Sequence, residues 1–371
     1  MTGRTAISAI AASLAIAATP AAAFAQDAPA EPVVDPAAAA AAAAPSAAAG
    51  GPQATTPPPA GREAARRGAA RRVAVKRAAG RIGVNLVGGV YHVGSATLTV
   101  PGRDVRISGR IVPYVPHQKV QVRVWLGSKL AKNVTVTPKP TKTKATATFS
   151  ARFIAGKTGD VRVFATHAQT PEQARLASKA AAVTVVDTSA GFGSSGPFVS
   201  LVQQKLAALG YATSTGGTFD AALGRALEAF RKVNGMDRTQ TLDGAIVDKL
   251  LRGVGGFKVR YPQHGRHVEA HLGQQVLALI ENGRVFRAYT TSSGKPSTPT
   301  VLGNFRFYWR QPGVNDRGMV DSTYFIRGYA IHGYPEVPTY PASHGCLRVP
   351  IPVAADIYNW VHIGDQIDVY Y

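Results

Sequence analysis

Residues 342–348 read Ala-Ser-His-Gly-Cys-Leu-Arg, and they contain Cys346, the only cysteine of the 371-residue chain. A single thiol has no partner for an internal disulfide, so it is either a packing residue or a chemical group. Free cysteines usually pack among apolar side chains, whereas Cys346 follows Ser-His-Gly and precedes an arginine by two residues. These polar neighbours predict a reactive thiol.

A thiol attacks acyl groups as the thiolate, and its ordinary pKa of about 8.5 leaves it mostly protonated at neutral pH. A nearby imidazole accepts that proton in cysteine–histidine catalysis. His344 is one candidate, because residues i and i−2 of an extended segment share a face. His332, in the sequence Ile331-His332-Gly333, is the other, and the fold has to bring it close. A structural zinc site is not predicted, since it needs four ligands in close pairs.

Three segments resemble the L,D-transpeptidase catalytic domain of bacterial cell-wall enzymes. They are Ile-His-Gly at residues 331–333, the sequence at 342–348, and residues 293–305, which resemble the strand–loop–strand of that family. The resemblance covers residues 257–371. The chain departs from the family pattern at 349–352, Val-Pro-Ile-Pro, where an Asn or Asp commonly follows the arginine.

The resemblance implies a cysteine enzyme with a mainly-β catalytic domain. Cys346 is implied as the nucleophile, and His332 as the general base and then the general acid. Backbone N–H groups around His344, Gly345 and Cys346 are implied as the oxyanion hole, in which one donor is typically worth about 3 kcal/mol.

Further side chains of the same motifs are expected to contact the substrate. These are Ser343, Gly333 and Arg348, whose guanidinium either holds a carboxylate or braces the loop. Tyr329 and Tyr340 are expected to line the cleft. The chemistry requires no metal and no organic cofactor.

The implied function is that of a peptidoglycan L,D-transpeptidase, which forms 3→3 cross-links between stem peptides. Cys346 takes the acyl group of a donor tetrapeptide's third residue, and the side-chain amine of an acceptor stem resolves the thioester. Two alternatives stay open. One is an L,D-carboxypeptidase or hydrolase that uses water in place of the amine, and the other is a wall-binding scaffold protein.

The first 25 residues are typical of a secretory signal peptide. Arg4 gives a weakly positive start, residues 7–18 are mostly apolar, and Ala-Phe-Ala at 23–25 fits cleavage before Gln26. The apolar stretch is shorter than the 18 or more residues of a membrane span. We therefore expect secretion to the cell wall, with an uncleaved membrane anchor as the alternative.

Residues 26–81 predict a linker whose composition changes along its length. Residues 26–61 are mainly Ala and Pro, as in flexible linkers, and 62–81 carry eight Lys and Arg against one Glu. The whole chain has a net charge of +21. The basic stretch is either a solvated tether or a segment that binds anionic cell-wall polymers. Nucleic acid is not expected for an exported chain without stacking aromatics.

Residues 82–187 consist of short runs rich in β-forming residues, separated by turn residues. The runs lie at residues 96–100, 105–109, 120–125, 145–149, 161–164 and 183–185. Their spacing predicts an immunoglobulin-like β-sandwich without a disulfide. No catalytic constellation lies here, so we expect spacing or surface contact as its role.

Residues 195–252 change to a helical period. Apolar side chains recur at three- and four-residue spacing in three stretches, which are 199–209, 223–230 and 246–251. Leu-Gly-Tyr at 209–211, with the aromatics that follow, resembles the small three-helix peptidoglycan-binding module. The alternative is a helical linker domain without a ligand, because apolar stripes of this kind are usually core.

The catalytic domain is expected over residues 257–371. Asn282 and Gly283 stand between two β-prone runs and predict a hairpin. A single helix is expected at 351–361, where Pro352 is tolerated in the first turn.

Three further histidines, His264, His267 and His271, lie near the start of this domain. They suggest a metal site, but a strand places only His267 and His271 on one face. We therefore expect surface histidines.

Overall fold

The computed structural model describes residues 77–371, all of which belong to one compact unit. The predicted signal peptide at 1–25 and nearly all of the predicted linker at 26–81 lie outside the described residues. The multidomain and mostly β organisation agrees with the sequence prediction, and four α-helices occur in the described part. No helix between residues 77 and 371 is long and apolar enough to cross a membrane.

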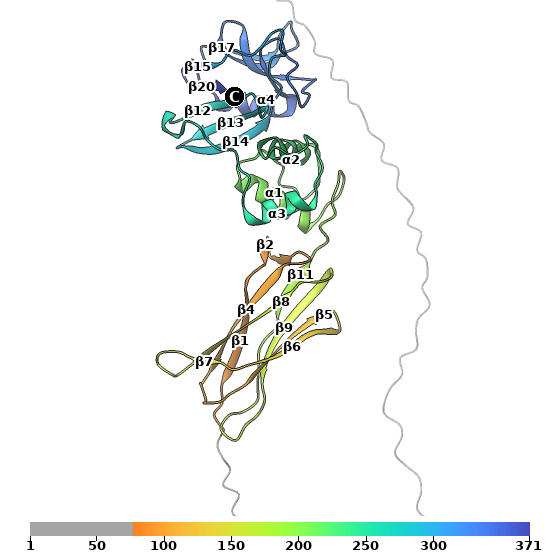
Figure 1. Ribbon diagram of the computed structural model, residues 1–371, viewed down its shortest axis with the longest axis vertical. Helices are drawn as coiled ribbons and strands as arrows, with labels where there is room; N and C mark the ends of the chain where they lie inside the picture. Colours follow the sequence, from red (N-terminus) through yellow and green to blue (C-terminus); the bar gives the residue numbers. More distant parts are fainter. Residues whose placement is uncertain (1–76) are drawn as a thin grey trace, which may run out of the picture. The chain divides into compact units, whose positions relative to one another are not determined.

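The N-terminal β region contains two sheets (Figure 1). The first has the strand order β1-β4-β8-β7, formed by β1 (Arg81–Gly88), β4 (Asp104–Val112), β8 (Ala147–Ile154) and β7 (Lys139–Pro140). The second has the order β2-β3-β11-β9-β5-β6, with β10 beside β9, formed by β2 (Tyr91–Val93), β3 (Ala96–Thr99), β11 (Ala181–Val185), β9 (Gly159–His167), β5 (Val120–Leu126), β6 (Lys129–Val136) and β10 (Leu176–Ala177).

Alternation of buried and exposed residues explains how these sheets pack. In β5, Val120, Val122 and Val124 are buried while the residues between them are partly exposed. Buried Val, Ile and Phe side chains from both sheets form one apolar core, so the sheets pack face to face. Each of the six predicted β runs overlaps a strand.

Residues 195–252 contain α1 (Pro197–Ala208), α2 (Ala221–Val233) and α3 (Gly244–Arg252), and the fourth helix lies in the C-terminal region. Two of the three begin at an aspartate, because the carboxylates of Asp220 and Asp243 accept the backbone N–H groups of Leu223 and Ile246, each at 2.9 Å. Gly253 ends α3 in the left-handed conformation.

The C-terminal region contains two further sheets and α4. One has the order β14-β13-β12-β20-β15, formed by β14 (Arg284–Thr290), β13 (Val276–Glu281), β12 (His267–His271), β20 (Gln366–Tyr370) and β15 (Gly303–Arg306). The other has the order β16-β17-β18-β19, formed by β16 (Trp309–Val314), β17 (Val320–Ile326), β18 (Tyr329–Tyr334) and β19 (Leu347–Pro350).

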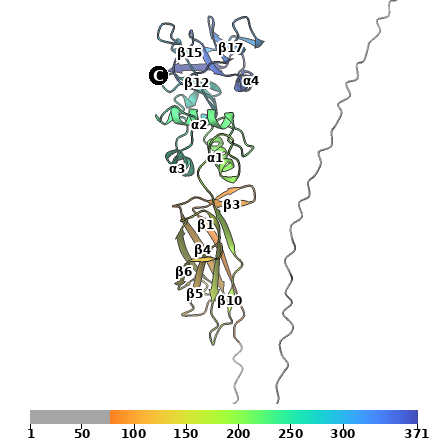
Figure 2. The same ribbon diagram turned by 90° about the vertical axis from the view of Figure 1, so that its right-hand side faces the viewer.

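Two local predictions for this region are confirmed. Asn282 and Gly283 join β13 to β14, and both have positive φ angles, 53° and 69°, as a tight hairpin turn requires. The predicted helix is α4 (Ile351–Trp360), which has proline in its first turn. It packs against β17 and β18, with α4 near β17 in Figure 2, and its Ile357 joins a core shared by both sheets.

The helices α1–α3 share their apolar core with the C-terminal region. Leu206 of α1 and Phe230 of α2 lie in one buried cluster with Ile280 of β13 and Ala288 of β14. The backbone of Ala288 also pairs with the turn after α1, where its N–H donates to the Gly210 carbonyl at 2.8 Å. The helical module and β14 therefore form a continuous packed interface.

The prediction of surface histidines is wrong for His267, whose side chain is 0% exposed. It lies on β12, which runs between β13 and β20 inside the sheet. Its Nε2 lies 3.2 Å from Oε1 of Glu269, and His264 Nδ1 lies 3.0 Å from Oδ2 of Asp368. Buried carboxylates thus supply the polar partners that water would give at the surface. Residues 77–371 contain no cluster of three or more His, Cys, Asp or Glu side chains suited to a metal ion.

Candidate active site

Cys346 immediately precedes β19, which pairs in parallel with β18, the strand that carries His332. This register pairs His332 with Arg348, which follows Cys346 by two residues, so the thiol and the imidazole come from adjacent strands. Both line a cleft of about 320 Å³. The sheet thereby brings together two residues that are fourteen positions apart in the sequence.

The Cys346 thiol is largely enclosed. Its Sγ donates to the carbonyl of Gly328 at 3.6 Å. Burial raises the pKa of the thiol, and the backbone N–H of Ala330 with the positive charges of Arg348 and Arg317 opposes this only in part. The thiol form therefore predominates at neutral pH, and attack on a carbonyl requires a base.

His332 is 3% exposed and has the properties of such a base. Its Nδ1 lies 2.9 Å from the carbonyl of Gly333, which fixes the proton on Nδ1 and leaves Nε2 with a free lone pair. Burial, opposed by the Gly333 hydrogen bond and aided by the charge of Arg348, lowers the pKa of His332 to about 4. The imidazole is therefore neutral at physiological pH and able to accept a proton.

The loop before Cys346 is held by its own side chains. Ser343 is buried, and its Oγ donates to the carbonyl of Cys346 at 2.6 Å while accepting the N–H of Gly345 at 3.0 Å. Ser343 therefore shapes the loop as well as lining the cleft. His344 is exposed at the rim, where its Nε2 lies 3.4 Å from Nζ of Lys295.

Gly345 is required by conformation. Its φ is +117°, and a Cβ at this position would lie 2.0 Å from the ring of Tyr329. Tyr329 thus packs against the loop backbone and is not among the residues that line the cleft. Tyr340 is 61% exposed and does not line it either.

A second segment braces the loop from outside. Oγ1 of Thr300 donates to the carbonyl of Gly345 at 2.8 Å and accepts the N–H of Gly294 at 2.9 Å. The N–H of Lys295 donates to the carbonyl of Ser343 at 2.9 Å. These residues belong to the segment 293–305 that the sequence associates with the site, and here they act as its scaffold.

Arg348 and Gly333 lie on the adjacent strands β19 and β18. The backbone of Arg348 exchanges two 3.0 Å hydrogen bonds with Ser292, and its guanidinium lies 4.0 Å from the ring centroid of Tyr334. Its side chain lines the cleft. A Cβ on Gly333 would lie 2.8 Å from the Cβ of Ala354, so this glycine permits α4 to pack against β18.

The cleft also contains residues that the sequence did not indicate, namely Arg317, Met319, Gly328 and Tyr334. Tyr334 could have been predicted from the sequence, because it stands two residues after His332 on the same strand and therefore on the same face. Arg317 and Met319 lie in the turn between β16 and β17, and their sequence shows no comparable pattern.

Comparison with known protein families gives two matches. Residues 265–369 match the L,D-transpeptidase catalytic domain. Residues 195–250 match the putative peptidoglycan binding domain. No curated protein matches the chain.

Several solved structures are similar to the chain. An L,D-transpeptidase from Xylanimonas cellulosilytica is 31% identical over 50% of this chain and 98% of its own, with a TM-score of 0.46. An L,D-transpeptidase from Stackebrandtia nassauensis is 20% identical over 50% of this chain and 96% of its own, with a TM-score of 0.32. One from Mycobacterium tuberculosis is 21% identical over 28% of this chain and 57% of its own, with a TM-score of 0.27.

Proposed function

The chain belongs to the L,D-transpeptidase family, and we propose that it forms 3→3 cross-links in peptidoglycan through an acyl-enzyme on Cys346. The observation that carries this proposal is the shared cleft of Cys346 and His332. A partly buried thiol and a neutral imidazole in one cleft are the parts that cysteine acyl transfer needs.

In the first half-reaction, Nε2 of His332 takes the proton of Cys346 as Sγ attacks the carbonyl carbon of a donor tetrapeptide's third residue. The bond from that carbon to the terminal residue's nitrogen then breaks, and His332 returns the proton to the departing amine. The products are a thioester and a free D-amino acid. Because the resting pair is neutral, proton transfer accompanies attack rather than preceding it.

In the second half-reaction, the side-chain amine of an acceptor stem attacks the thioester carbonyl. His332 accepts a proton from the amine, and Cys346 leaves and regains its proton. The new amide is the cross-link. The enzyme returns to its starting state without a metal or cofactor.

The developing oxyanion needs backbone donors beside the thiol. The N–H of Gly345 already donates to Ser343, so its main contribution is the loop conformation. The N–H groups of His344 and Cys346 have no hydrogen-bond acceptor in the described part of the chain. These two groups are therefore the donors that we assign to the oxyanion hole.

Product analysis tests the proposal. The full chain is incubated with purified muropeptide monomers, and the products are separated and weighed by mass spectrometry. A transpeptidase yields 3→3 dimers. Trimmed monomers alone would instead show the carboxypeptidase or hydrolase, and unchanged monomers would show the wall-binding scaffold.

We propose that residues 195–252 bind peptidoglycan, which the family match over 195–250 supports. Because this module shares its core with β13 and β14, an isolated module would expose apolar surface. The binding test therefore uses residues 195–371 with Cys346→Ala, pelleted with wall sacculi. Recovery in the supernatant would make the module a spacer.

We also propose an immunoglobulin-like sandwich for residues 82–187. The order β1-β4-β8-β7 corresponds to the A-B-E-D sheet of that fold, and the neighbours β11-β9-β5 correspond to G-F-C, which supports the assignment. The remaining domain limits that we propose are a signal peptide at 1–25, a linker at 26–81 and a catalytic domain at 257–371. Export to the cell wall follows from the signal and the substrate.

Anionic cell-wall polymers are proposed as a second partner of the basic β region. Residues 77–187 carry 17 Lys and Arg and four Asp and Glu, and β6 exposes Lys129 and Lys132. Retention on wall polymers should weaken with added salt, since exposed charges are screened within about 8 Å at physiological ionic strength. Salt-independent retention would exclude this charge-based contact.

A further inference from the structure

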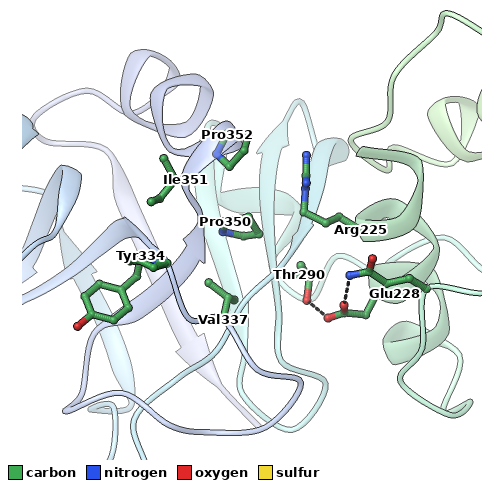
Figure 3. A pocket seen from close by; sticks show the side chains of 10 residues that line it. Arg225, Glu228, Thr290, Tyr334, Val337, Pro350, Ile351 and Pro352 are labelled. Carbon is green, nitrogen blue, oxygen red and sulfur yellow. Dashed lines mark hydrogen bonds between the residues drawn. The ribbon is translucent and has the colours of Figure 1, made fainter. Parts of the chain in front are cut away.

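A second cavity, of about 300 Å³, lies where α2 meets the C-terminal region. The helical module contributes Arg225, Glu228 and Gln240 to its wall. The opposite wall includes Thr290, Tyr334 and residues 350–352, which join β19 to α4 (Figure 3). No role in the acyl transfer described above falls on these residues.

The floor of this cavity is a closed hydrogen-bond network centred on Glu228. One carboxylate oxygen accepts Oγ1 of Thr290 at 2.6 Å and lies 2.9 Å from Nζ of Lys232. The other oxygen accepts Nε2 of Gln240 at 3.0 Å. Lys232 is buried, and its ammonium also donates to Thr290. The charge of Glu228 is therefore balanced by Lys232, and both of its carboxylate oxygens have hydrogen-bond partners. Through Thr290, Glu228 joins the helical module to β14.

Arg225 is a charged residue of this cavity that takes no part in the hydrogen-bond network of Glu228. Its Nε–H is buried and has no hydrogen-bond partner among residues 77–371. Arg231 on the same helix is different, because its guanidinium binds the carbonyl of Thr241 at 3.0 Å and the carboxylate of Asp243 at 2.6 Å. Figure 3 shows Arg225 extending from α2 into the space beside Pro350 and Pro352.

A guanidinium whose Nε–H has no hydrogen-bond partner, and which lines a preformed cavity, is suited to bind a planar anion. Guanidinium groups bind carboxylates through two parallel hydrogen bonds, which no other side chain reproduces. The cavity also shares Tyr334 with the catalytic cleft, where that ring contacts Arg348. The two cavities are therefore neighbours, with Tyr334 of β18 between them.

We propose that Arg225 binds an internal carboxylate of the substrate stem peptide, so that the helical module supplies a specificity residue to the catalytic cleft. This inference rests on the proposed function, since the ligand is the peptide whose acyl group Cys346 takes. It gives the module a direct role in substrate selection in addition to wall attachment. Peptides that lack the carboxylate are poorer substrates, with the loss appearing in KM.

The experiment measures cross-linking by the full chain with a muropeptide carrying free internal carboxylates, and with the same muropeptide amidated at those positions. Arg225→Gln should raise KM for the free form by about tenfold or more, the low end for a charge-assisted hydrogen bond. Its kcat should stay within about twofold, because the residue is remote from the reacting atoms. The wild type should show the same rise in KM with the amidated peptide, and Arg225→Gln should add nothing to it.

Arg252→Gln is the matched control. It removes the same charge from α3, where the guanidinium is half-exposed and pairs with Asp248 of its own helix, and it should leave KM unchanged. An unchanged KM in Arg225→Gln, or an equal loss in Arg252→Gln, would overturn the assignment. The amidation comparison on the wild type tests the inference even if Arg225→Gln folds poorly.

A separate measurement isolates the proposed function from this inference. A carbapenem is a small acyl donor that reaches Cys346 without extending to Arg225, so it should acylate Arg225→Gln and the wild type at equal rates. A wild type that is neither acylated nor able to form dimers would refute the proposed function itself. Normal acylation with no change in KM would refute the role of Arg225 alone.

Discussion

Two buried histidines of the C-terminal region have opposite electrostatic surroundings. His332 on β18 lies near Arg348, and its only polar side-chain contact within the described residues is with the carbonyl of Gly333. His267 on β12 lies against two buried carboxylates, Glu269 and Asp368. Burial lowers the pKa of His332 to about 4. Burial also lowers the pKa of His267, but the hydrogen bonds to Glu269 and Gly265 and the nearby negative charges outweigh it and raise the pKa.

The difference shows that the partners of a buried imidazole decide what it does. Without a carboxylate beside it, His332 stays neutral and keeps a lone pair for a proton, as a general base must. With two carboxylates beside it, the charged form of His267 is favoured, and the imidazole holds the buried carboxylate of Glu269 by a hydrogen bond. The residues that line the cleft of Cys346 and His332 include no Asp or Glu, and the ion network lies in the other sheet.

The largest expected effect on cross-linking activity is that of replacing Cys346. Cys346→Ala should abolish dimer formation, because no other thiol exists in the chain, and should leave folding intact, because alanine is small and apolar. A carbapenem should add one covalent mass to the wild type and none to the variant. Intact-protein mass spectrometry measures both. An adduct that persists in Cys346→Ala would exclude it as the nucleophile.

The next largest effect is the difference in kcat between variants of the two histidines. His332→Ala should reduce kcat by about 10²–10⁴-fold, the usual contribution of a general base. His267→Asn should leave the kcat of the folded fraction within about tenfold, since His267 lies in the other sheet and does not line the cleft. Kinetics on each variant at equal folded concentration give the ratio. Equal losses in the two variants would contradict the division into a catalytic and a structural histidine.

The pairing of Cys346 with His332 could be proposed from the sequence, because both residues stand in recognisable motifs, and the structure places both in one cleft. The sequence did not predict that His267 is buried. That depends on β12 lying between β13 and β20, and strand order is a long-range property that periodicity does not contain. The roles of Gly345 and Tyr329 were also hidden, since a positive φ and the ring that packs against it appear only in three dimensions.

The packing of the helical module against its neighbours could not be predicted from the sequence either. The helical period at 195–252 predicted helices that the structure contains, but apolar stripes do not reveal which neighbour they pack against. Here they pack partly against β13 and β14. Arg225 gave no signal either, because an arginine on the polar side of a helix is ordinarily solvated, and only the opposite wall makes it a candidate for binding.

A smaller effect is expected on stability at the ion network. His267→Asn should lower the free energy of unfolding by about 1–3 kcal/mol, because it removes the hydrogen bond of the imidazole to the buried carboxylate of Glu269. His271→Asn is the control on the same strand, since that side chain is only partly buried and has no carboxylate hydrogen bond in the described residues. Urea unfolding at neutral pH measures both. An equal loss in the two variants would show that strand packing, not the ion network, is responsible.

The smallest expected effect is on the pH dependence of stability, because the pKa values of the two histidines are shifted in opposite directions. The folded pKa of His332 is about 4 and the unfolded value is about 6.5, so the unfolded chain binds more protons between these limits. Falling pH should therefore destabilise the wild type relative to His332→Gln, by on the order of 3 kcal/mol near pH 4. The folded pKa of His267 is raised. Its contribution is present in full below about pH 6.5, and it is lost as pH rises through the folded pKa.

The measurement needs a probe confined to the C-terminal region, because a multidomain chain does not unfold in one step. Trp125→Phe supplies it, since the two tryptophans that remain, Trp309 and Trp360, both lie in that region. In this background, the stability of the wild type relative to His332→Gln should fall as pH falls from 6.5 to 4. The advantage of the wild type over His267→Asn should shrink as pH rises above 6.5. Differences that stay constant with pH would mean that neither imidazole has the environment described here.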